Sequence, residues 1–156
     1  MSTIREQIVS TAVVALSTGA PESVPAPLRT RLDSPSADQL PALTVYQGTE
    51  TVEPMRDAKA GAASHGPIVR RALLLSVEVL TKATAGALPD QAADPILAWA
   101  TASLAAAGSF GGLANGPAIE IGTKFEYEQA ETSFCRATQT FRLEYQTRAD
   151  DAESLT

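Results

Sequence analysis

The sequence predicts an α+β domain with a mixed, mainly antiparallel sheet of about four to five strands and two helices packed on one face. The main observation is the run 66–82, GPIVRRALLLSVEVLTK, which is rich in β-branched and other apolar residues. Its alternate residues Val69, Leu73 and Val77 point to one face, as in a strand that has a core on one side. Two segments with helical periodicity and a closing pair of strands complete the pattern.

Composition limits the kinds of function. The chain has 156 residues and a formal net charge of −6, and it has no long block of either charge. A single domain of this size can bury a core, and the absence of a basic cluster argues against a nucleic-acid grip. Cys135 is the only cysteine, so no intrachain disulfide can form. No segment reaches the ~18 apolar residues of a membrane helix, and the amino terminus lacks an export signal, so we expect a soluble protein.

The amino-terminal third predicts a helix, a proline-rich link and a short strand. Thr3 and Glu6 have the spacing of a capping box, and an apolar stripe follows over residues 4–17. Prolines prevent regular structure up to Pro27, and residues 28–32 then alternate as a half-buried strand.

The middle of the chain predicts two strands separated by a loop. Residues 40–47 read as a buried strand that continues over 49–53 past a bend at Gly48. Residues 54–67 are rich in alanine, glycine and charge and have no periodic apolar face, so we expect a mobile loop there.

The carboxyl-terminal half predicts a helix followed by two strands. Asp94 is the expected N-cap, with Pro95 at the first helical position and Gly108 at the stop. Strands are expected over 118–128 and 133–147. The domain is therefore predicted to span residues 1–148, and residues 149–156 are expected to form a flexible acidic tail.

No catalytic, cofactor or metal site emerges from the residues, so we expect no enzyme and no cofactor. The run AGSFG around Ser109 follows a helix, whereas a nucleophile elbow precedes one. Cys135 in a strand and His65 in a loop are better explained by packing and solvation than by a thiol mechanism. One histidine and one cysteine fall short of a zinc set, and Glu126, Glu128 and Glu131 read as a solvated strand face.

The loop 54–67 has two interpretations. It is either an unremarkable insertion or a segment that becomes ordered when it meets a partner subunit. In the second case, the candidate partner contacts lie in and beside the loop: Pro54, Met55, Arg56, His65 and Ile68.

The element order, taken together, resembles that of tail terminator proteins of long-tailed bacteriophages, also called tail completion or minor tail proteins. The resemblance extends over residues 4–147 and is strongest at 40–53 and 141–147, although no single motif is diagnostic. The segments concerned are LRTRLD, LPALTVYQGTETVE, VRRALLLSVEVL, ADPILAWATASLAAAG and FRLEYQT.

The resemblance implies a non-enzymatic virion protein that is assembled in the host cytoplasm. Such subunits form homohexameric rings that cap the tail tube, stop its polymerisation and offer a joining surface to the neck protein of the head-tail connector. Exposed sheet edges can be completed by neighbouring copies in such a ring. An acidic chain also suits a ring through which DNA passes without specific binding.

Two other interpretations stay open. The chain could be a head completion or stopper protein, or another neck component, with the same ring symmetry on the portal side. It could also be a small-molecule-binding or enzymatic α+β domain, which would require a deep polar pocket at His65 or Cys135.

Overall fold

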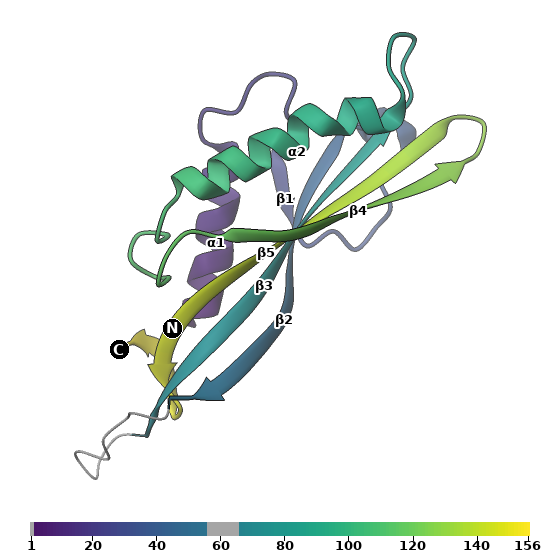
Figure 1. The fold of residues 1–156 in the computed structure, drawn as a ribbon. Helices are drawn as coiled ribbons and strands as arrows, with labels where there is room; N and C mark the ends of the chain where they lie inside the picture. The colour runs from purple at the N-terminus through teal and green to yellow at the C-terminus, as the bar shows by residue number, and fades with distance from the viewer. Residues whose placement is uncertain (1, 56–65) are drawn as a thin grey trace.

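The computed structural model describes residues 2–55 and 66–156 and confirms the predicted α+β class. Two helices lie on one face of a curled, mostly antiparallel sheet (Figure 1). The helices are α1 (Ile4–Ser17) and α2 (Pro89–Ala106), and a short 3-10 helix, η1 (Ala37–Gln39), follows the first strand. The strands are β1 (Pro27–Arg29), β2 (Ala42–Pro54), β3 (Ile68–Lys82), β4 (Ile119–Gln129), β5 (Ser133–Arg148) and β6 (Asp151–Leu155).

The sheet has the strand order β1-β2-β3-β5-β4, and β6 pairs with the end of β5. Only β1 and β2 are parallel. β3 lies in the centre and pairs with β5 along its whole length, from Ile68 opposite Arg148 to Lys82 opposite Phe134. This order places β4 at one edge of the sheet and β1 with β2 at the other.

The core lies between the helices and the sheet. The alternation predicted for β3 is confirmed, because Val69, Leu73, Leu75, Val77 and Val79 are buried. β5, a strand predicted over 133–147, supplies the matching inward set Cys135, Ala137, Phe141, Leu143 and Tyr145. Facing them are the buried side chains of the two helices: Ile4, Ile8, Val9, Ala12, Leu16, Ala93, Ile96, Leu97, Ala100 and Leu104.

Helix α1 has the predicted bounds but only half of the predicted capping box. The Thr3 hydroxyl accepts a hydrogen bond from the backbone N–H of Glu6 at 3.3 Å. The Glu6 carboxylate instead pairs with the guanidinium of Arg29 in β1, with Nη2 at 2.6 Å from Oε2. This pair ties the start of α1 to the edge of the sheet, and it lowers the pKa of Glu6.

Helix α2 begins earlier than predicted. Its first residue is Pro89, not Pro95, and the N-cap is Leu88, not Asp94. The side chain of Gln91 accepts the backbone N–H of Leu88 at 2.9 Å, which caps the helix. Pro95 is accommodated inside the helix, while Gly108 follows its end with a φ of 56°, as expected for a left-handed stop.

Strand β1 is shorter than predicted. It ends at Arg29 because Thr30 has a φ of 47°, which no strand residue adopts, and Leu32 is 92% exposed. The following loop crosses the sheet face that the helices leave open. There the Lys82 ammonium donates to the carbonyl of Ala37 at 3.0 Å, and Thr44 is buried.

The carboxyl-terminal segment is not a free tail in the structure. β6 pairs with β5, with Thr147 opposite Leu155. The chain before it is also held, because the N–H of Ala149 donates to the carbonyl of Pro67 at 2.8 Å and the N–H of Gly66 to Asp150 at 3.0 Å. The acidic composition suggested fraying, but strand pairing and these hydrogen bonds join the segment to the sheet.

Candidate functional site: the β4 edge and the open face of the sheet

The most exposed strand of the structure is β4. It pairs with β5 on one side, and no other described strand pairs with it on the other side. All of its residues except Thr123 are exposed. Backbone N–H and C=O groups along an unpaired edge can bind a further strand, so β4 offers a surface on which another chain can be added to the sheet.

Apolar side chains accompany this edge. Ile119, Ile121, Phe125 and Tyr127 are 62%, 53%, 42% and 64% exposed, respectively. Near the tip of the β4–β5 hairpin, Tyr127 borders a shallow hollow with Leu88, the N-cap residue of α2, which is also exposed. Ile121 lines a hollow on the open face and Tyr127 borders the hollow beside α2, so both faces of this strand expose apolar side chains that a partner could cover.

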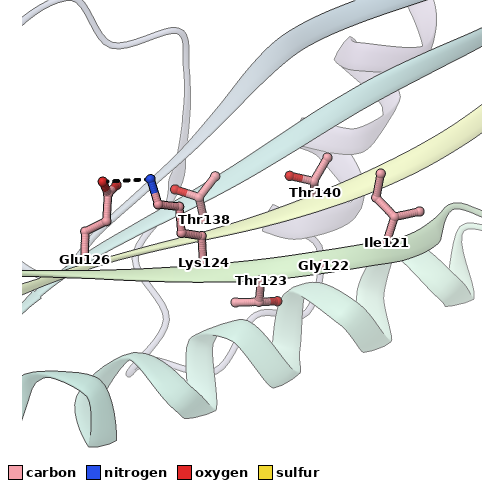
Figure 2. Close-up of a pocket in the computed structure, with 7 residues that line it drawn as sticks. All are labelled: Ile121, Gly122, Thr123, Lys124, Glu126, Thr138 and Thr140. Atoms are coloured by element: carbon pink, nitrogen blue, oxygen red, sulfur yellow. Dashed lines mark ion pairs between the residues drawn. The ribbon is translucent and has the colours of Figure 1, made fainter.

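A second shallow hollow lies on the open face beside β4 (Figure 2). Figure 2 shows Lys124 and Glu126 joined as an ion pair on the open face, with Thr123 on the opposite side of the β4 ribbon. The ammonium lies 3.0 Å from the carboxylate. Thr138 and Thr140 of β5 complete the lining. A shallow, open floor of this kind fits a flat partner surface better than a buried small molecule.

Several charges on the open face form ion pairs. Arg70 donates to Glu53 at 2.6 Å, and Arg142 donates to Glu144 at 2.7 Å. The hydrogen bond from Arg70 also lowers the pKa of Glu53. A cation that lies beside a carboxylate produces little net electrostatic field. These ion pairs are therefore not arranged to hold phosphates.

The candidate contact loop is only partly described. Arg56 and His65 lie outside the described residues. Pro54 closes β2, and the N–H of the exposed Met55 donates to the carbonyl of the half-buried Ile68 at 3.3 Å, where β3 begins. The two ends of the loop are therefore adjacent, while its role as a partner contact stays a prediction.

The residues weighed for chemistry have packing roles where they are described. Cys135 is buried on the inner face of β5, and burial raises the pKa of its thiol. Ser109 accepts the N–H of Gly112 at 3.1 Å within the glycine turn after α2. Within residues 2–55 and 66–156, no cluster of three metal-ligating side chains occurs. Neither described helix is long and apolar enough to span a membrane.

Sequence reasoning did not predict the β4 edge as a site. The alternation of Phe125 and Tyr127 with Glu126 and Glu128 predicts a strand, and the strand is present. The same alternation gives no information on whether a neighbour covers the strand. The available signal was the charged residue at every second position of 124–128, which is typical of a strand with a solvent-exposed face.

The chain was also compared with known proteins. It matches no protein family, and no curated protein matches it.

Proposed function

We propose that this protein is a phage tail terminator, a structural subunit that forms a ring on the end of the tail tube. The proposal is supported by the resemblance in element order and by the α+β architecture in which two helices cover one face of the sheet. The observation that carries it is the exposed β4 edge with its apolar side chains, because such a subunit is completed by contact with another chain.

The proposed activity is geometric. A ring that matches the tube on one side and differs from it on the other ends polymerisation, since the next tube subunit finds no complementary surface. The other side of the ring then joins the neck protein of the head-tail connector. DNA passes through without specific binding, in keeping with the net charge of −6 and with the paired charges on the open face.

Tube assembly in the presence of the protein tests the proposal. Purified protein is mixed with polymerising tail tube subunits, and tube lengths and ends are examined by negative-stain electron microscopy. We expect shortened tubes that end in a ring. Rings found only on connector-bearing heads would favour a head completion or stopper protein instead, and a monomer without effect on tubes would contradict both.

A matched pair of variants tests the part played by the edge. Ile121→Glu places a charge on β4, whereas Leu32→Glu places one on a loop residue that is even more exposed. We expect Ile121→Glu to abolish capping and Leu32→Glu to leave it intact. Equal activity of the two variants would remove β4 from the ring contact.

A further inference from the structure

The part of the β4 edge after its bulge is open to pairing with another strand. Natural edge strands are shielded by proline, by several charges, by bulges or by short length. β4 contains no proline, and its one irregularity lies between Glu120 and Gly122, near the start of the strand. Its four charged residues, Glu120, Lys124, Glu126 and Glu128, are of both signs. Residues 122–128 therefore present a regular ladder of unpaired backbone groups at the edge.

The side chains of this segment are complementary to themselves. If two copies of β4 lie antiparallel with Phe125 opposite Phe125, Lys124 of each copy lies opposite Glu126 of the other. Opposite charges placed directly across a strand pair are stabilising. The two side chains are 73% and 48% exposed, so they are available for such a contact.

Each neighbouring register sets like charges opposite each other, including the register centred on Glu126, in which Lys124 lies opposite Glu128. Centring the pair on Lys124 places two ammonium groups opposite each other, and centring it on Glu126 places two carboxylates opposite each other. Centring on Thr123 sets Glu126 against Glu120. Like charges directly across strands are destabilising, so the charge pattern selects the register centred on Phe125.

The two faces of β4 also agree with this register. Residues opposite each other in an antiparallel pair lie on the same face of the sheet. Lys124 and Glu126 both lie on the open face, away from Thr123 (Figure 2). On the helix side, Phe125 meets its own copy and Tyr127 meets Thr123, which covers two of the exposed aromatic rings.

We propose that two copies of this chain associate through β4, antiparallel over residues 122–128, about a two-fold axis at Phe125. The five-strand order of each copy then continues into the other as one sheet. This inference goes beyond the proposed function and stands without it, because it needs no tail tube. A paired edge cannot accept a third strand, so such a dimer has to open before β4 can enter a ring.

Charge exchange between Lys124 and Glu126 tests the dimer. Sedimentation equilibrium of the full chain measures the dissociation constant of the wild type, of Lys124→Glu, of Glu126→Lys and of the double exchange. Each single change turns two attractive pairs into two repulsive ones, so we expect dimer affinity to fall about 10-fold or more. The double exchange restores the attraction and should return affinity to near the wild-type value.

A second exchange serves as the control. Arg142 and Glu144 have the same spacing on the interior strand β5 and form an ion pair at 2.7 Å. Arg142→Glu should leave the dimer unchanged, and circular dichroism checks that every variant is folded.

Two results would overturn the inference. One is a wild type that stays monomeric at about 100 µM. The dissociation constant of the dimer would then be too high for the dimer to matter biologically. The other is a folded double exchange as weak as the single variants. A tube-capping protein that is monomeric when free would refute the dimer alone, whereas a β4 dimer that never caps tubes would refute the terminator function alone.

Discussion

The phenol of Tyr145 in β5 donates a hydrogen bond to the carboxylate of Glu50 in β2, across the strand that separates them. Arg71 of that intervening strand, β3, donates to the other carboxylate oxygen at 2.8 Å. The Glu50 side chain is only 8% exposed, and it follows the irregularity at which the register of β2 shifts. The three side chains thus fix the alignment of three neighbouring strands.

Removal of this buried carboxylate should strongly destabilise the fold. We expect Glu50→Ala to lower the free energy of unfolding by about 3 kcal/mol, because it leaves Arg71 and the Tyr145 hydroxyl without their acceptor. Urea denaturation followed by circular dichroism measures the change. Glu53→Ala is the matched control, since its carboxylate is exposed and pairs with the exposed Arg70. An unfolding midpoint as low for Glu53→Ala as for Glu50→Ala would disprove the role of burial.

Alkaline pH should act through Tyr145. Its pKa is raised, first by burial and then by its bond to Glu50, so the folded state holds this proton more tightly than the unfolded state does. The resulting stability is complete below the unfolded tyrosine pKa of about 10 and is lost as the pH rises above it. Unfolding measured between pH 8 and 11 should show this decline, and Tyr145→Phe should flatten it. An unchanged slope in the variant would exclude Tyr145 as its cause.

The inner face of β5 should dominate stability, whereas the loop after β1 should not matter. Leu143 is fully buried, and Leu143→Ala should cost about 3 kcal/mol through lost burial and the cavity left behind. Leu32→Ala removes the same atoms from a side chain that is 92% exposed, so its effect should stay within about 0.5 kcal/mol. Thermal unfolding compares the two variants. Similar losses of stability in the two variants would contradict the exposure of Leu32, and with it the end of β1 at Arg29.

Cys135 should be unreactive in the folded protein. Its thiol is buried on the helix side of β5, and its raised pKa keeps it protonated at neutral pH. Ellman's reagent at pH 7.5 should label it only after denaturant is added. Rapid labelling of native protein would show that the thiol is accessible and would reopen the thiol mechanism.

The sequence predicts elements with one strong periodic face well, and it predicts boundaries set by a single residue poorly. The stripe of α1 and the alternation of β3 were predicted because burial leaves a regular pattern in the chain. The early end of β1 depends on the backbone angle of Thr30, and α2 depends on a proline that its interior tolerates. Neither the backbone angle of Thr30 nor the tolerance of α2 for Pro95 produces a periodic pattern in the sequence.

The candidate site was harder to predict because it depends on strand order. Phe125 and Tyr127 look like core residues in sequence, yet β4 lies at an edge because β5 pairs with β3, more than fifty residues earlier in the chain. A residue alternation describes one strand and contains nothing on its neighbours. The unpaired side of β4 became visible only when the sheet was assembled.

The bond between Met55 and Ile68 closes the β2–β3 hairpin before the chain enters residues 56–65. Strand pairing is thereby independent of the length of that connection. A fluorescent label or an affinity tag inserted there should leave the sheet register intact, which makes this position the natural place to attach a reporter.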